Sequence, residues 1–179
     1  DYNTAVMRLF MQGAVSRAYG PGAKFDYMPV LIGRQGLGKS MFLRRLGARS
    51  EWYCDNLNTV EGDAAAEKLR GMWCVFAGTT NSPQFLTDST GNRRFLPVEC
   101  GVHEAPMSLF TPGVEDYFKQ AWAEAVHVYK TKRPVLVLDG RLAEYAIEKQ
   151  EDYTEDDPRV GIVQAYLDGR VAEERVRSF

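Results

Sequence analysis

The octapeptide GRQGLGKS, residues 33–40, constrains the fold of this chain more than any other part of its sequence. It fits the pattern G-x-x-x-x-G-K-[ST]. It directly follows the apolar run MPVLI and opens the helix-like segment SMFLRRLGA, which Gly47 closes. A buried strand, a glycine-rich turn and a helix in this order form a loop that cradles phosphate groups. The sequence therefore predicts an α/β fold built around this loop.

The residue types of the loop suit a nucleoside triphosphate. Glycines let backbone N–H groups converge on a phosphate without side-chain clash, and the helix that follows adds its positive dipole end. We expect Lys39 to reach the β- and γ-phosphates and the Ser40 hydroxyl to coordinate magnesium. The predicted ligands are ATP and Mg²⁺, and we expect Arg34 and Gln35 to be exposed. The residues expected to bind them are Gly33, Arg34, Gln35, Gly36, Leu37, Gly38, Lys39, Ser40 and Met41.

Strand-like and helix-like segments alternate along the chain. Helical spacing of apolar residues marks residues 3–18, and runs rich in β-formers mark 28–32, 74–80 and 94–99. Further helices are expected at about 63–70, 114–130 and 140–150, and after Pro158, with the acidic stretch 151–157 as a solvated linker. This alternation predicts a mainly parallel sheet covered on both faces. We divide the chain into an N-terminal helix and lead-in (1–27), a core (28–112) and a helical C-terminal region (113–179).

Composition excludes several classes of protein. The formal net charge of −2 gives no general attraction to nucleic acid or anionic membrane, so such binding needs a local patch. The three cysteines form no CxxC pair, and the two histidines have no metal-ligand spacing. No apolar run approaches the length of a membrane span, and no secretory signal opens the chain. We expect a cytoplasmic protein, and we interpret the start at Asp1, inside a helical pattern, as a piece of a longer chain.

Polar side chains follow one of the predicted strands. CVFAGTT ends in Thr79 and Thr80 and leads to Asn81, at the edge where open α/β sheets bind ligands. Asn81 would hydrogen-bond an attacking water or the γ-phosphate, or would merely form a turn before Ser82-Pro83. Arg93 and Arg94 start the next strand after a tight turn. They are either surface charge or guanidinium groups that stabilise a transition state as an arginine finger.

One expected group is absent. A hydrolytic phosphate-loop protein needs an acid at the end of a neighbouring strand to hold magnesium and position water. GMWCVFAGTTN, residues 71–81, contains none. The nearest acids, Glu61 and Asp63, stand at the start of the predicted second helix and are best interpreted as capping residues.

Taken together, these motifs resemble the virulence-associated protein E family, which comprises phage- and island-borne P-loop ATPases similar to superfamily 3 helicases and the AAA+ class. The resemblance covers roughly residues 5–130 and rests on GRQGLGKS, TTNSPQFLTDSTGNRRFLPV and WAEAVHVYK. It implies a P-loop NTPase fold in which Asn81 is a sensor. Arg93 or Arg94 would then be a finger reaching a neighbouring subunit's nucleotide in a homo-oligomeric ring, expected to be a hexamer. It also implies DNA as a partner, an origin in a phage or mobile element within a bacterial cell, and a primase or other replication partner.

The departure from the family pattern concerns the missing acid. Family members run from a Gly-x-Trp strand into paired acidic residues, a helix and a basic loop before the next strand. Here Trp73 is followed at once by Cys74. Two parallel strands need a crossover of a dozen or more residues. We therefore expect Trp73 and Cys74 not to be consecutive in the natural protein, so that the Walker B acid and a DNA-contacting loop fall in a segment absent from this chain.

The leading prediction is an ATP-hydrolysing, ring-forming motor core that acts on DNA, a helicase for replication of a mobile element. Its catalytic residues would be Lys39, Asn81, Arg93 and Arg94, with Ser40 on the metal. Two alternatives stay open. One is a non-hydrolysing switch that binds ATP to assemble. The other is a small-molecule phosphotransferase, with the paired arginines as its lid.

Overall fold

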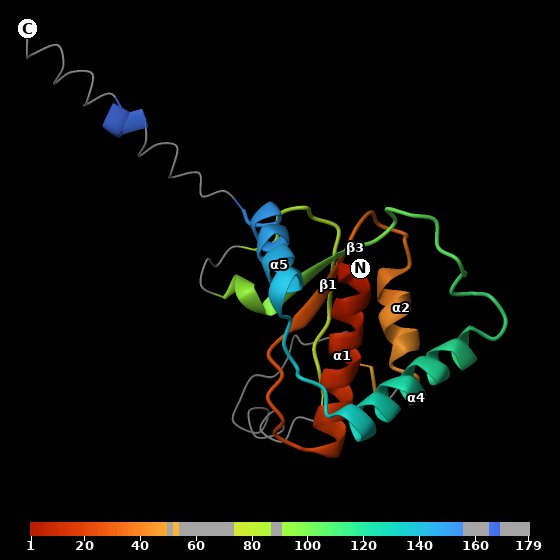
Figure 1. The fold of residues 1–179 in the computed structure, drawn as a ribbon. Coiled ribbons are helices and arrows are strands. Elements are labelled where there is room, and N and C mark those ends of the chain that lie inside the picture. Colours follow the sequence, from red (N-terminus) through yellow and green to blue (C-terminus); the bar gives the residue numbers. More distant parts are fainter. Residues whose placement is uncertain (50–51, 54–73, 87–90, 156–164, 169–179) are drawn as a thin grey trace, which may run out of the picture.

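The computed structural model describes residues 1–49, 52–53, 74–86, 91–155 and 165–168. It is a mixed α/β structure in which helices flank a small parallel sheet (Figure 1). None of the described helices combines the length and the apolar character needed to cross a membrane. In chain order, the elements that position the site are α1 (Tyr2–Tyr19), β1 (Met28–Ile32), α2 (Lys39–Leu46), β2 (Gly78–Thr80), the 3₁₀ turn η2 (Asn92–Arg94), β3 (Phe95–Glu99), α4 (Val114–Lys132) and α5 (Gly140–Asp152).

The sheet has the order β2-β1-β3, and both pairings are parallel. Ile32 is level with Thr80 on one side and with Glu99 on the other, so all three strands end at the same edge. Val30, Leu31 and Ile32 are all buried although consecutive strand residues point to opposite faces. The predicted parallel sheet, covered on both faces, is confirmed for these strands.

Helix α1 packs along β1 and β3 and crosses α4 (Figure 1). The Asp1 side chain caps it by accepting a hydrogen bond from the backbone N–H of Thr4 at 2.8 Å. At its other end the Arg17 guanidinium donates to three backbone carbonyl oxygens, those of Ala23, Phe25 and Cys74. One side chain thus joins α1 to the chain before β1 and to the chain before β2.

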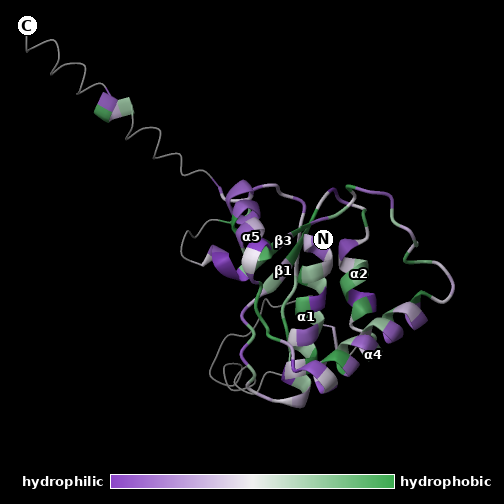
Figure 2. Cartoon of the chain, viewed as in Figure 1, coloured by the Kyte–Doolittle hydropathy of each residue, from purple (hydrophilic) through white to green (hydrophobic). Residues whose placement is uncertain are grey.

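A single hydrophobic core joins the three segments into which the sequence was divided. It contains Val6 and Phe10 of α1, Leu31 and Leu96 of the sheet, and Phe118 of α4. Figure 2 shows the strands as predominantly hydrophobic and α4 as alternating between polar and apolar residues, as expected for a helix with one face on the core. The C-terminal helices are therefore packed on the sheet unit through a shared core.

Two buried or half-buried side chains fasten α4. The Gln12 amide donates to the backbone carbonyl of Ala125 at 3.0 Å, and the Trp122 indole N–H donates to that of Leu46 at 2.8 Å. Leu46 ends α2, so the indole satisfies one of the carbonyls that a helix end leaves without an intrahelical partner. Helices α1 and α2 are thereby both fixed to α4.

Most predicted elements begin and end within two residues of the expected bounds, and two predictions differ more. The strand predicted over 74–80 is formed only at Gly78–Thr80. Ahead of it the Cys74 carbonyl accepts a hydrogen bond from Arg17, and Val75 and Ala77 pack on the core. The acidic stretch is not simply a solvated linker. Tyr153 and Glu155 share backbone hydrogen bonds with Phe85 and Leu86. The helix predicted at 63–70, Glu61, the segment 71–73 and most of the segment after Pro158 lie outside the described residues.

Candidate functional site

The loop between β1 and α2 lies at the carboxyl edge of the sheet. Gly33, Gly36 and Gly38 have φ values of 152°, 87° and 79°, a region that side-chain-bearing residues rarely adopt. A Cβ on Gly33 would lie 2.8 Å from the Cys100 carbonyl oxygen, so the loop passes close to the chain that leaves β3. The motif glycines are thus required by the backbone path, and Arg34 and Gln35 are exposed as predicted.

Lys39 occupies the centre of this loop. The residue is only 8% exposed, and its ammonium group donates to the backbone carbonyls of Gly33 at 2.7 Å and Arg34 at 2.8 Å. Its third hydrogen bond, at 2.9 Å, goes to the side-chain oxygen of Asn81, directly after β2. Two of the predicted catalytic residues, far apart in sequence, are therefore in contact.

The loop also offers backbone donors. Within the described part of the chain, no backbone acceptor pairs with the N–H groups of Arg34, Gln35, Gly36 and Gly38. Next to them, α2 begins at Lys39 and directs its positive dipole end towards the loop. An ammonium group, free N–H groups and a helix N-terminus form a set that suits a phosphate chain.

The hydroxyl groups predicted near the site differ in what they do. The Ser40 hydroxyl is exposed and lies 3.4 Å from the Thr79 hydroxyl. Thr80 instead accepts a hydrogen bond from the backbone N–H of Ser82 at 3.0 Å, which fixes the turn after β2. Ser40 and Thr79 are thus open to a ligand, whereas Thr80 shapes the backbone that carries Asn81.

Arg93 and Arg94 are not part of this cluster. They lie in η2, immediately before β3, and both are exposed. Because β3 runs parallel to β1, they lie at the edge of the sheet where the strands begin, whereas the phosphate loop follows the strand ends (Figure 1). Five residues at about 3.3 Å each separate Arg94 from Glu99, so this pair is roughly 16 Å from the loop's level along the strand.

Glu99 is the acid that sequence reasoning did not consider. It ends β3 beside Ile32, where a carboxylate could approach a metal. Its carboxylate instead accepts hydrogen bonds from the Lys149 ammonium at 2.6 Å and the Tyr153 hydroxyl at 2.7 Å. These bonds, the one from Lys149 first, lower the pKa of Glu99. The signal in the sequence was the acid that ends RFLPVE, but the sequence does not show that its partners are Lys149 on α5 and Tyr153 directly after that helix.

No described group of three or more His, Cys, Asp or Glu side chains is arranged to hold a metal ion. Cys100, which follows Glu99, is half-buried, and burial raises the pKa of its thiol while the nearby Lys39 charge opposes the rise. Ser40, the residue predicted for the metal, therefore stands in the described site without an acidic partner, and Asp63, which was interpreted as a capping residue, lies outside the described residues.

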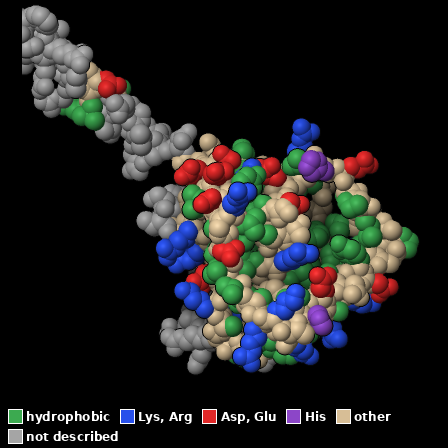
Figure 3. Space-filling view, viewed as in Figure 1, with side chains coloured by type: hydrophobic (Ala, Val, Ile, Leu, Met, Phe, Trp, Pro, Cys, Tyr) green, Lys and Arg blue, Asp and Glu red, His purple; other side chains and the backbone are tan. Residues whose placement is uncertain are grey.

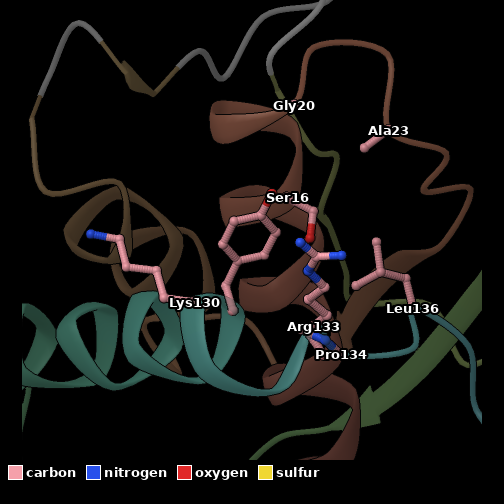
Figure 4. Close-up of a pocket in the computed structure, with 8 residues that line it drawn as sticks. Ser16, Gly20, Ala23, Lys130, Arg133, Pro134 and Leu136 are labelled. Carbon is pink, nitrogen blue, oxygen red and sulfur yellow. The ribbon is translucent and has the colours of Figure 1, made fainter.

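A cavity of about 500 Å³ lies elsewhere, between the last turns of α1 and α4. Figure 4 shows Arg133 extending into it towards Ser16. Both helices present their C-terminal, negative dipole ends there, so the cations of this region complement the helix dipoles. Helix ends of this sign disfavour phosphate, and we place the candidate site at the loop.

The family model of the virulence-associated protein E-like domain matches the chain in two segments, residues 1–76 and 74–155. Together the segments span residues 1–155 of the 179. They meet at residues 74–76, directly after Trp73, where the sequence departs from the family pattern. No curated protein matches the chain.

Proposed function

The chain belongs to the virulence-associated protein E-like domain family, and from this premise we propose that it is the ATP-hydrolysing core of a ring-forming motor. The motor acts on DNA, as a helicase in the replication of a phage or mobile element. The observation that carries the proposal is the contact between the Lys39 ammonium and the Asn81 side chain at the carboxyl edge of a parallel sheet. That edge is where ligands of open α/β sheets bind.

In the proposed reaction each residue has a separate task. Lys39 and the backbone N–H groups of the loop would bind the β- and γ-phosphates, and the Ser40 hydroxyl would hold Mg²⁺. Asn81 orients the water that attacks the γ-phosphorus, and ADP and phosphate leave. Asn81 already contacts the ammonium that would touch the γ-phosphate, so its side chain stands within reach of the attacking water. The same arrangement supports a P-loop NTPase fold.

The position of the arginine pair supports an assembly. Arg93 and Arg94 lie at the sheet edge opposite to their own phosphate loop, so in one subunit they cannot stabilise charge on the γ-phosphate. A second copy of the chain could present them to that loop, as a ring of subunits would. The same position counts against the phosphotransferase alternative, because a lid must cover its own subunit's phosphates.

The acid that completes the mechanism is proposed to belong to a segment between Trp73 and Cys74. The division of the family match at residues 74–76 supports this proposal. The intact mass of the purified protein tests it, because the sequence given corresponds to 20.2 kDa. A mass several kilodaltons higher would mean that the protein contains a further segment between Trp73 and Cys74. A mass of 20.2 kDa would mean that the protein lacks the acid, and this result favours the non-hydrolysing switch.

The central experiment measures ATP turnover with and without single-stranded DNA. Lys39→Ala is expected to lower kcat by a factor of roughly 100 or more, as the loss of one preorganised charge donor does. Lys24→Ala, a change at an exposed lysine paired with Asp26, serves as the control and should turn over like the wild type. Full activity of Lys39→Ala would overturn the mechanism. Tight ATP binding with negligible turnover in the wild type would select the switch.

Mixing two inactive variants tests the shared site. Lys39→Ala lacks the phosphate contact, and the double variant Arg93→Ala/Arg94→Ala lacks the guanidinium groups. Each is expected to be inactive alone. Mixed rings regain turnover because some interfaces then pair an intact loop with an intact arginine pair. A mixture that stays inactive would contradict the proposal that the arginines act between subunits.

A further inference from the structure

Large apolar side chains are exposed next to the phosphate loop. Leu37 lies within the loop and is 44% exposed, Met41 on α2 is 37% exposed, and Phe110 in the segment between β3 and α4 is 75% exposed. Figure 3 shows hydrophobic side chains gathered around a hollow on the side of the molecule where α2 and this segment lie. We refer to Leu37, Met41 and Phe110 as the apolar patch.

Close contacts connect the segment after β3 to the phosphate loop. A Cβ on Gly101 would lie 3.0 Å from Leu37, and a Cβ on Gly38 would lie 3.2 Å from Leu109. Phe110 follows Leu109, about 3.8 Å further along the backbone. The patch is therefore continuous with the residues that would bind the phosphates.

Helix geometry brings Met41 to the same side. Gly38, Met41 and Arg45 are spaced i, i+3 and i+7, so they share one face of α2. Leu109 contacts that face at Gly38, and the Arg45 guanidinium lies 5.8 Å from the centre of the Phe110 ring. Arg45 also pairs with Glu115 at 2.6 Å, which compensates its charge. Because Phe110 is 75% exposed, most of its surface stays accessible to a ligand.

Hydrogen bonds fix the backbone turn that carries Phe110. The Phe110 N–H donates to the Ser108 hydroxyl at 3.2 Å, and the Thr111 N–H donates to the Ser108 carbonyl at 3.1 Å. The ring is thus presented on a hydrogen-bonded turn. A largely exposed aromatic ring is a stacking platform for a flat partner.

We propose that the apolar patch receives the nucleobase of the nucleoside triphosphate whose phosphates bind residues 33–40. The base stacks on Phe110, and Leu37 and Met41 cover its edge. This inference rests on the proposed function. It adds a binding site for the base, the part of the nucleotide that the phosphate loop does not contact. A base has an apolar face whatever its hydrogen-bonding pattern, so stacking selects nucleotides over inorganic phosphates.

The experiment compares two ligands that differ in the base. ATP and inorganic triphosphate, each with Mg²⁺, are titrated calorimetrically into the wild type, Phe110→Ala and Lys39→Ala. Phe110→Ala is expected to weaken ATP roughly 5- to 150-fold, which is the range of a base–aromatic stack, and to bind inorganic triphosphate like the wild type. Tyr19→Ala is the control, since Tyr19 is an aromatic residue 54% exposed at the far end of α1, and it should change neither affinity.

The outcomes separate this inference from the proposed function. A wild type that binds neither ligand overturns both. A wild type that binds both ligands equally, or a Phe110→Ala variant that binds ATP unchanged or loses both ligands alike, overturns the base site and leaves the phosphate site standing. Size-exclusion chromatography is run in parallel. If Phe110→Ala changes the oligomeric state and keeps its ATP affinity, the patch is a contact between copies and the inference is wrong.

Discussion

The contact between Lys39 and Asn81 can be tested without any ligand, through the stability of the protein. The perturbation is a double-mutant cycle that combines Lys39→Met with Asn81→Ala. Lys39→Met keeps most of the side-chain volume and removes the ammonium group. Asn81→Ala removes the acceptor of one of the three hydrogen bonds that the Lys39 ammonium donates. The cycle isolates the free energy that the two side chains share.

The magnitude follows from the burial of the two partners. A hydrogen bond to a charged group contributes about 1.5–3 kcal/mol. Lys39 is buried but Asn81 is exposed. Water can therefore partly replace the amide oxygen, and we expect the coupling free energy at or just below the lower limit of this range, about 1–1.5 kcal/mol. Asn81→Ala alone should lower the melting temperature by about 2–6 °C in a chain of this size.

The assay is equilibrium unfolding in urea, followed by far-ultraviolet circular dichroism, for the wild type, both single variants and the double variant. A control cycle pairs Lys39→Met with Gln84→Ala, an exposed residue that makes no side-chain contact with Lys39, and should be additive within about 0.5 kcal/mol. Equal additivity in the Lys39–Asn81 cycle would refute the contact, and with it the main support for Asn81 as the residue that positions water.

Three further predictions concern the frame of the site. Gly33→Ala should destabilise the protein more than Gly36→Ala in urea unfolding, because a Cβ on Gly33 meets the Cys100 carbonyl and a Cβ on Gly36 meets open space; equal losses would contradict the close approach. Asn92→Ala should cost about 1–2 kcal/mol in the same assay, because the buried amide donates to Thr154 and fastens η2, and no change would show that η2 is held otherwise. The hydrogen bond to Glu99 raises the pKa of Lys149. The stability that Lys149 contributes is therefore present below its unfolded-state pKa near 10.4 and is lost as pH rises through the higher folded-state pKa. Lys149→Met should remove this alkaline loss from the pH dependence of unfolding, and an unchanged loss at alkaline pH would refute the pairing.

Local patterns predicted the strand and the helix on either side of the loop. The strand Met28–Ile32 and the helix from Lys39 to Leu46, closed at Gly47, depend on a short apolar run, glycines and helical spacing that lie within a few residues of one another. The edge rule for parallel sheets also brought Asn81 towards the loop. It could not identify Lys39 as the partner, because that depends on how far each side chain extends from its own strand end or helix.

Features that depend on distant residues were not predictable in the same way. Ahead of the strand that leads to Asn81, the Cys74 carbonyl accepts a hydrogen bond from Arg17, more than fifty residues earlier, and no local pattern shows this contact. The position of Arg93 and Arg94 away from their own loop follows from the parallel pairing of β1 and β3. The alternation of strands and helices predicted a parallel sheet but not which strands would be neighbours. The hydrogen bonds of the Glu99 carboxylate could not be predicted either, because they depend on α5 packing against the end of β3.

Glu99 decides how the missing acid is to be understood. If this carboxylate held the metal, Glu99→Gln would abolish Mg²⁺-dependent turnover while nucleotide binding persisted. We expect turnover to be retained, because Lys149 and Tyr153 already donate hydrogen bonds to the carboxylate.

The effect of Glu99→Gln should appear instead in the stability of the protein. The folded pKa of Glu99 is lowered, so its contribution is present above the unfolded value near 4.3 and is lost as pH falls through the folded value. Its side chain is 37% exposed, which limits the contribution to about 1 kcal/mol. Glu99→Gln should therefore flatten the acid limb of the stability curve. Loss of turnover with an unchanged acid limb would instead make Glu99 the metal-binding acid, and no segment after Trp73 would be needed to supply one.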